Sequence, residues 1–321
     1  MQKLAIFLAI IITLSLNACS STSQCQKHPS TSWADQAQIS RDIHKLASTE
    51  FAGRKTGSEG AALTRHYLIQ RFQQVGLEPW QGNYQHPFSF TKSFSDRVGI
   101  NIAGVLLATT PTSQWRVVLA HYDHLGHKGS RIYFGADDNA SGVAGLLQLA
   151  QHAASKGSTV NLLFVATDAE EPGLYGGYAL ADKLKNTSSQ PQIPQIELAI
   201  NLDMIGRPDR RSAIYIEGAR RFDSFDEIKQ IMTKSNQLCI RTSQPKSFDG
   251  SVISVDLLRA SDHYAMHKVG IPWLYFGVPT HRDYHQTSDI AEKIDINFVA
   301  ATTESAYQLL VIDSFLLKNS Q

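Results

Sequence analysis

Apolar residues along this chain follow two spacings, one typical of helices and one typical of buried strands. Helical spacing is found in seven stretches, at 39–46, 59–75, 140–155, 174–184, 222–235, 262–269 and 295–317. Short continuous apolar runs lie between them, at 99–107, 117–120, 162–166, 198–202, 214–216 and 273–276. Helices that alternate with buried strands predict an α/β protein, a three-layer αβα sandwich around a mixed, mostly parallel sheet.

The amino terminus has a different pattern. One cation, Lys3, precedes an apolar stretch from Leu4 to Leu16, which is typical of a secretory signal. That stretch is shorter than the roughly 18–20 residues that span a bilayer. The letters Leu-Asn-Ala-Cys, which end at Cys19, resemble the lipobox of bacterial lipoproteins, which implies cleavage before Cys19 and a lipid on its thiol. The alternative is a soluble secreted protein in which Cys19 is incidental.

These patterns divide the chain into three parts. We expect a signal peptide over residues 1–18, a flexible tether over 19–34 and one folded domain over 35–318. The mature protein would be exported and attached by lipid to the bacterial cell envelope, at the outer membrane or a membrane facing the periplasm. Removal of 1–18 leaves 29 cations against 29 anions, so no net positive charge would bind the protein to anionic lipid. The attached lipid would be its only membrane anchor.

Composition excludes some classes of protein. The 321 residues carry 30 Lys and Arg against 29 Asp and Glu, so the basic surface of a nucleic-acid binder is not expected. The 3 Cys include no CxxC pair, which excludes a structural zinc site made of thiolates. Whether Cys25 pairs with Cys239 stays open at this stage, and so does the oligomeric state, with a monomer the simplest expectation.

Acidic and histidine residues gather directly after the predicted strands, where open α/β sheets place their binding sites. The clusters are His121-Tyr-Asp123-His124, Asp137-Asp138-Asn139, Asp168-Ala-Glu170-Glu171, Asp203-Met204 and His281-Arg-Asp-Tyr284-His285. So many carboxylates at one edge would repel each other, and the sequence shows no compensating cluster of Lys or Arg. A divalent metal supplies the missing charge. Imidazole and carboxylate without thiolate suit zinc, with cobalt or manganese as substitutes.

The donors exceed what one tetrahedral ion needs, so a carboxylate shared between two ions would use them all. Glu170 and Glu171 point in opposite directions if the chain is extended there. One of them would then bind metal, and the other would face a water molecule.

Taken together and in this order, the motifs from His121 to Asp289 resemble those of the co-catalytic di-zinc aminopeptidases, metallopeptidase family 28. The resemblance implies the zinc exopeptidase fold and two zinc ions, with Asp138 shared between them. His121 and Asp203 would complete one site, and Glu171 and His285 the other. The peptide bond after the shared Asp is cis in some members of the family.

The resemblance also implies an activity, hydrolysis of the N-terminal peptide bond of peptides that have a free amine. Glu170 would act as general base on a water that bridges the metals and then protonate the leaving amine. Asp123 would accept the second ring N–H of His121, and Tyr284 would stabilise the oxyanion.

Three alternatives remain open. Glutaminyl cyclases resemble this fold but use one zinc ion, and a scaffold protein could keep the fold without the chemistry. A carboxypeptidase would need an arginine for the substrate carboxylate, for which Arg207 or Arg282 is available. Other histidines have no assigned part: His124 and His127 are expected to be structural, His281 to line the mouth of the site, and the role of His263 stays open.

Overall fold

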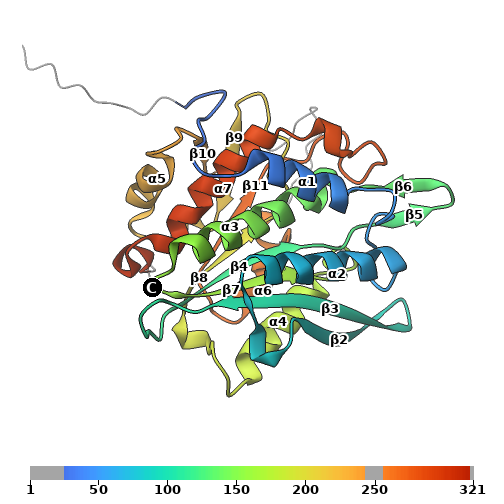
Figure 1. Ribbon diagram of the computed structural model, residues 1–321, viewed down its shortest axis with the longest axis horizontal. Helices are drawn as coiled ribbons and strands as arrows, with labels where there is room; N and C mark the ends of the chain where they lie inside the picture. Colours follow the sequence, from blue (N-terminus) through green and yellow to red (C-terminus); the bar gives the residue numbers. More distant parts are fainter. Residues whose placement is uncertain (1–24, 243–255, 319–321) are drawn as a thin grey trace, which may run out of the picture.

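The computed structural model describes residues 25–242 and 256–318, and these form a sheet between two layers of helices (Figure 1). The described helices are α1 (Gln36–Leu46), α2 (Glu59–Gln74), α3 (Gly142–Lys156), α4 (Tyr175–Asn186), α5 (Phe225–Thr233), α6 (His263–Lys268) and α7 (Ile296–Val311). The described strands are β1 (Glu78–Pro79), β2 (Gln85–Lys92), β3 (Ser95–Leu106), β4 (Trp115–His121), β5 (Gly126–Lys128), β6 (Arg131–Tyr133), β7 (Asn161–Thr167), β8 (Ile196–Leu202), β9 (Ala213–Glu217), β10 (Cys239–Arg241) and β11 (Trp273–Gly277). The predicted αβα sandwich is confirmed.

The main sheet has the strand order β1-β3-β7-β4-β8-β11-β9-β10, and β2 pairs with β3. Its centre is parallel, because β4 pairs in parallel with both β7 and β8, and β11 pairs in parallel with β8. Antiparallel pairings lie further out, between β3 and β7 and between β9 and β11. The carboxyl ends of four neighbouring strands therefore open at the same edge of the sheet.

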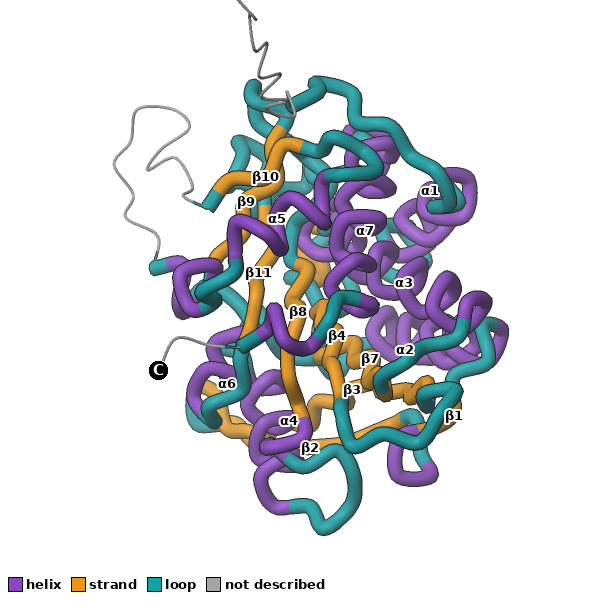
Figure 2. Tube along the Cα trace, turned by 90° about the vertical axis from the view of Figure 1, so that its left-hand side faces the viewer, coloured by secondary structure: helices purple, strands orange, loops and turns teal. Residues whose placement is uncertain are grey.

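Alternate residues of β4 belong to two different hydrophobic cores. Val118 and Ala120 pack in a core with residues of α1, α2, α3 and α7. Val117 and Leu119 pack in a second core with residues of α4 and α6. Because successive side chains of a strand point to opposite faces, a strand that is apolar at every position needs helices on both faces. Figure 2 shows the strands between these two sets of helices.

Side-chain caps fix where three helices begin. Asp35, Ser58 and Asp295 each accept a hydrogen bond from a main-chain N–H in the first turn of α1, α2 and α7. The carboxyl end of α7 differs from its predicted bound at 317. The helix ends at Val311, because Ile312 is extended, with φ −63° and ψ 150°.

The amino-terminal segment differs from the flexible tether predicted over 19–34. Its described part, 25–34, is fastened to the domain at several places, among them a disulfide and a buried carboxylate. A disulfide joins Cys25 to Cys239, so the pairing that was open in the sequence is present. The Glu304 side chain, only 1% exposed, accepts the main-chain N–H groups of Ser32, Trp33 and Ala34 at 2.7–2.9 Å. A buried carboxylate with three donors cannot release this segment without a large desolvation penalty.

The predicted signal peptide and Cys19 lie outside the described residues. Among the helices that the structure describes, none is long and apolar enough to cross a membrane.

Candidate metal centre

The candidate ligands lie at one edge of the sheet because each follows a parallel strand or begins a helix beside one. His121 is the last residue of β4, and Asp203 directly follows β8. Glu171 lies in the loop after β7, and His285 lies in the loop after β11. Asp138 belongs to the irregular turn Ala136–Ser141, which leads into α3. Residues that are up to 164 positions apart in the sequence, from His121 to His285, are thus brought together.

One group of donor atoms surrounds the first oxygen of Asp138. His121 Nε2 lies 3.3 Å from Asp138 Oδ1 and 3.4 Å from Asp203 Oδ1. All three side chains are buried, and their donor atoms lie close enough together to hold one ion. Donor atoms around a four-coordinate zinc, with bonds of about 2.0–2.1 Å, lie roughly 3.3–3.4 Å apart. The observed spacing fits a tetrahedral ion.

A second group surrounds the other oxygen of Asp138. His285 Nε2 lies 3.0 Å from Asp138 Oδ2 and 3.3 Å from Glu171 Oε2. His124 Nδ1 lies 2.7 Å from Glu171 Oε1 and 3.8 Å from Asp138 Oδ2. The two oxygens of Asp138 therefore face two separate sets of donors, which is the arrangement of a carboxylate shared between two ions.

The electrostatics of the cluster agree with a carboxylate that is held in its charged form. Burial raises the pKa of Asp138, but hydrogen bonds from His121 and His285 outweigh burial and hold that pKa well below its usual value. Burial lowers the pKa of His285, and its contacts with Asp138 and Glu171 reverse this and raise the pKa to about 10. The imidazoles and carboxylates therefore attract each other strongly, and a cation can replace the proton between them.

Residues at or next to the candidate ligands adopt left-handed backbone conformations without being glycine. They are Ala169 (φ 57°), Met204 (φ 59°) and His285 (φ 56°). Each such residue costs on the order of 1 kcal/mol or more and persists only where its surroundings enforce it. Ala169 precedes Glu170 and Met204 follows Asp203, so the strain is concentrated where side chains are aimed into the cluster. The Asp138–Asn139 peptide bond is cis, as the resemblance implies for some members of the family.

Glu170 is held beside the first group by its main chain. Its N–H donates to Asp123 Oδ1 at 2.9 Å, and the N–H of Glu171 donates to Asp123 Oδ2 at 3.3 Å. Burial raises the pKa of Glu170 well above its usual value; His121 opposes this, and the nearby Asp203 and Glu171 add to it. A carboxylate with a raised pKa is suited to accept a proton near neutral pH.

Asp123 is placed differently from the contact that the resemblance implies. The Nδ1 atom of His121 lies 3.1 Å from the main-chain carbonyl of Asp123 and 3.8 Å from its carboxylate. The Asp123 carboxylate accepts hydrogen bonds from the main-chain N–H groups of Glu170 and Glu171, and it therefore orients the loop that carries both glutamates. The carbonyl is the nearer acceptor for the ring N–H of His121.

Tyr284 and His285 share a loop that is anchored by Asp283. The rings of Tyr284 and His285 stack, with centroids 3.8 Å apart. Asp283 accepts hydrogen bonds from Arg207 at 3.0 Å and from Lys293 at 2.8 Å. Burial raises the pKa of Asp283, but the donors Lys293, Ser288 and Arg207 outweigh it, so the net pKa is lowered. Arg207, one candidate for recognising a substrate carboxylate, is thus engaged in holding this loop.

A second carboxylate supports the turn that carries Asp138. Asp289 accepts the main-chain N–H of Asp137 at 3.1 Å and that of Asp138 at 3.2 Å. Asp137 itself lies 3.1 Å from His281 Nε2, so His281 joins this turn to the loop after β11. Asp289 ends the last sequence motif, but the sequence gives no sign that its carboxylate accepts main-chain N–H groups about 150 residues away.

Three histidines outside the predicted ligand set differ in their surroundings. His124, which the sequence predicts to be structural, is buried, and its Nδ1 atom belongs to a second group of donors that could hold a metal ion. His127 is exposed on β5. The ring of His263 packs between Trp273 and Tyr275, with centroids 4.5 and 4.6 Å away, which is a core position.

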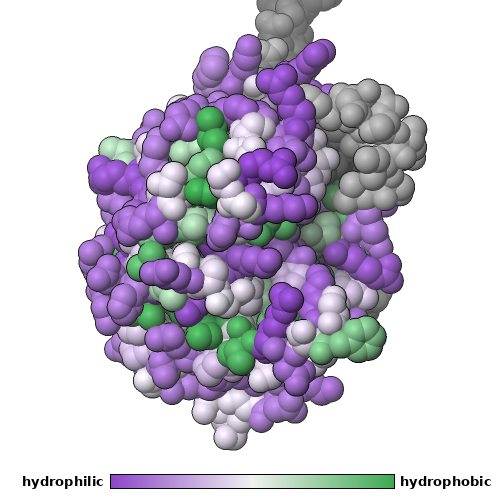
Figure 3. Space-filling view, turned by 90° about the vertical axis from the view of Figure 1, so that its right-hand side faces the viewer, coloured by the Kyte–Doolittle hydropathy of each residue, from purple (hydrophilic) through white to green (hydrophobic). Residues whose placement is uncertain are grey.

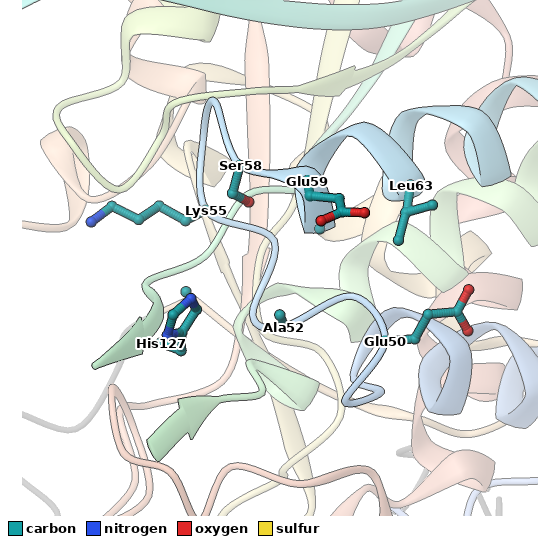
Figure 4. A pocket seen from close by; sticks show the side chains of 9 residues that line it. Glu50, Ala52, Lys55, Ser58, Glu59, Leu63 and His127 are labelled. Carbon is teal, nitrogen blue, oxygen red and sulfur yellow. The ribbon is translucent and has the colours of Figure 1, made fainter. Parts of the chain in front are cut away.

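A pocket of about 510 Å³ is lined by none of the candidate ligands. Its wall is formed by residues between 50 and 63 together with Gly126 and His127, and Figure 4 shows Lys55, Ser58 and Glu59 around it. Figure 3 shows the side of the molecule toward which β5 and β6 project, where apolar side chains form small groups among hydrophilic ones. The chemistry-bearing side chains thus belong to the strand ends and not to this pocket.

Residues 101–310 match the family described as Peptidase family M28. This is more than half of the chain, and the protein belongs to that family. The resemblance that the motifs carry is confirmed.

Among curated proteins, Aminopeptidase YwaD of Bacillus subtilis is 29% identical over 212 residues, which is 63% of this chain and 42% of that protein. The chain spans less than half the length of several curated relatives that it matches, with 48% and 40% of two others covered.

Solved structures show the same fold at low identity. BSAP, a zinc aminopeptidase from Bacillus subtilis, superposes with a TM-score of 0.67 at 13% identity, over 89% of this chain and 98% of that one. The glutaminyl cyclase of Fimbriiglobus ruber also gives a TM-score of 0.67, at 17% identity, over 88% and 96% of the two chains. The fold alone therefore does not separate hydrolysis from cyclisation.

Proposed function

We propose that this protein is an aminopeptidase that uses two zinc ions. His121, Asp138 and Asp203 would hold one ion, and Asp138, Glu171 and His285 the other. The observation that carries the proposal is the placement of Asp138, whose two oxygens face separate donor groups at 3.3 Å and 3.0 Å. A carboxylate that served a single ion would not need donors on both sides.

Zinc is the metal that the donors favour. The described donor groups contain imidazole and carboxylate but no thiolate, and this set suits zinc. A relative in Pyrenophora teres that is named a probable zinc metalloprotease supports this choice. When bound, zinc supplies a Lewis acid for the scissile carbonyl and lowers the pKa of coordinated water to about 7.

The protein's own groups move the proton. A carboxylate oxygen of Glu170 takes a proton from the attacking water and delivers it to the nitrogen of the leaving amine, so the carboxylate ends the cycle unprotonated. Asp123 holds the main chain of Glu170 and of Glu171, which fixes the base relative to a ligand. The Tyr284 hydroxyl would donate to the oxyanion, since burial and the carboxylates Asp138 and Glu171 raise the pKa of Tyr284 and keep its proton in place.

An assay on three matched peptides separates aminopeptidase from cyclase. We expect cleavage of a peptide with a free N-terminal amine, with no cleavage of its acetylated form. A glutamine-initiated peptide should lose its first residue without forming a ring. Ring closure without hydrolysis would instead favour the cyclase, and equal cleavage of the acetylated peptide would rule out recognition of the amine. A peptide amidated at its carboxyl terminus tests the carboxypeptidase reading, which predicts no cleavage of it.

Export and lipid attachment complete the proposal. The Cys25–Cys239 disulfide supports an exported protein, because disulfides persist in oxidising compartments. We expect cells to incorporate labelled palmitate into the protein and Cys19→Ser to abolish the labelling while leaving export intact. Labelling that survives Cys19→Ser would contradict attachment at this residue.

A further inference from the structure

Arg54 is a buried arginine whose hydrogen-bond acceptors within the described residues are all main-chain carbonyls. Its side chain is 0% exposed. Nε donates to Tyr122 O at 2.8 Å, and Nη2 donates to Gly135 O at 2.9 Å. Nη1 donates to Leu46 O at 2.6 Å and to Phe134 O at 2.7 Å. Because a guanidinium is planar and presents its N–H groups in a rigid fork, these carbonyls are fixed relative to each other.

Three of the four carbonyls that Arg54 binds belong to the two segments that carry metal-facing side chains, and the fourth, that of Leu46, lies at the end of α1. Tyr122 lies between His121 and Asp123 in the sequence, at the end of β4. Gly135 directly precedes the turn Ala136–Ser141, which contains Asp138. Arg54 therefore joins the segment of His121 to that of Asp138, although it contacts neither side chain.

Thr56 extends these contacts to a third segment, the loop after β7. Its hydroxyl donates to Asp168 Oδ1 at 2.8 Å and lies 3.4 Å from Asp123 Oδ2. Asp168 follows β7 and stands two positions before Glu170. Through the side chains of Arg54 and Thr56, one short stretch of the chain thus contacts the loops after β4 and β7 and the turn before α3.

The backbone of this stretch packs too closely for a side chain at Gly53. Gly53 has φ +72°, and a Cβ there would lie 2.4 Å from the carbonyl oxygens of Gly126 and Tyr133. Its own carbonyl accepts the N–H of Gly126 at 2.9 Å. The stretch therefore lies directly against the main chain that leads from His121 to Asp138. Figure 4 shows its other side, where Lys55 and Ser58 line the pocket.

The charge of Arg54 also bears on the cluster. Burial lowers the pKa of Arg54 to about 10, while Asp138, Asp289, Asp123 and Glu171 act in the opposite direction, so Arg54 stays charged at neutral pH. The sequence shows no cluster of cations among these carboxylates, but the fold brings one buried cation from outside the motifs to them.

We propose that residues 53–56 form a clamp for the metal centre, in which Arg54 is the principal positioning residue and Thr56 a second one. The clamp holds the main chain beside His121, Asp138 and Glu170 in the geometry that binds metal. This inference rests on the proposed function, because it assumes that these groups bind zinc.

Arg116 provides a matched control at the opposite end of the same strand. It is 1% exposed, donates to Leu309 O at 2.9 Å and Ile312 O at 2.8 Å, and pairs with Glu197 at 3.2 Å. Both arginines are buried and bind main-chain carbonyls, but Arg116 lies at the start of β4 and His121 at its end. Substitution of either arginine should lower the Tm, but only substitution of Arg54 should weaken zinc binding.

The experiment compares zinc affinity in the full chain by competition with a chromogenic chelator, with folding monitored by circular dichroism and Tm. We expect Arg54→Lys to weaken zinc binding by about 10–100-fold, the usual effect of losing a group that orients ligands. Arg116→Lys should leave the affinity within about twofold of the wild type. Equal effects of the two substitutions, or none, would overturn the clamp. Wild-type protein without zinc affinity would instead overturn the proposed function.

Thr56→Val decides the matter if Arg54→Lys does not fold. This substitution removes one hydroxyl and keeps the size of the side chain. The clamp predicts that zinc binding weakens by about tenfold while Tm changes by only a few degrees. Unchanged zinc affinity in this variant would overturn the proposal.

Discussion

Glu170→Gln is expected to lower kcat by a factor of about 10³–10⁴ while both metal equivalents remain bound. The amide keeps the shape of the carboxylate but cannot accept a proton from water. The N–H that Glu170 donates to Asp123 at 2.9 Å is a main-chain group and survives the substitution. Steady-state kinetics and metal analysis on the same preparation measure the two quantities together.

Glu78→Gln is the matched control for this substitution. Glu78 is exposed on β1, at the far edge of the sheet, and its replacement should leave kcat unchanged. If Glu170→Gln keeps more than about a tenth of the wild-type kcat, Glu170 is not the general base. If the Glu170→Gln variant loses metal instead, Glu170 is a metal ligand, and Glu171 would be the general base.

Asp138→Asn has the second large expected effect, the loss of both metal equivalents. An amide carries no negative charge and offers one oxygen in place of two, so neither donor group keeps its shared ligand. Asp203→Asn provides the comparison, because Asp203 contacts only the first group, 3.4 Å from His121. Zinc titration followed by calorimetry should show no tight binding in the first variant and one tight equivalent in the second.

The two variants contradict the account if they behave alike. One equivalent lost from each would mean that Asp138 serves a single ion. Retention of both equivalents in Asp138→Asn would place the metal elsewhere.

Elements with strong apolar patterns could be predicted from the sequence, and elements with weak ones could not. β4 and β7 are buried at every position and β8 at every position but Glu197, and each contains a continuous apolar run that predicts a strand. In contrast, β2 alternates exposed and buried residues and includes Pro87, so its pairing with β3 depends on the partner strand. The strands β5, β6 and β10 have three residues each, too few to show an alternation of apolar and polar residues. They form because β5 pairs with β6 across a tight turn and β10 pairs with the distant β9.

The candidate site shows the same division. His121, Asp138, Glu171, Asp203 and His285 follow recognisable strand and helix signals, so their meeting at one edge could be foreseen. Arg54 could not, because it stands in a loop between two helices and its partners are main-chain carbonyls, which have no sequence signature. His124 follows the same strand end as His121, and only the structure shows that its ring faces Glu171, with Nδ1 2.7 Å from Oε1.

A crystal structure of the zinc-loaded protein, with anomalous data at the zinc edge, tests the central claim most directly. The account predicts two peaks about 3.5–4 Å apart, one on each side of Asp138, with His121 at one and His285 at the other. A single peak, or peaks that do not share Asp138, would contradict it.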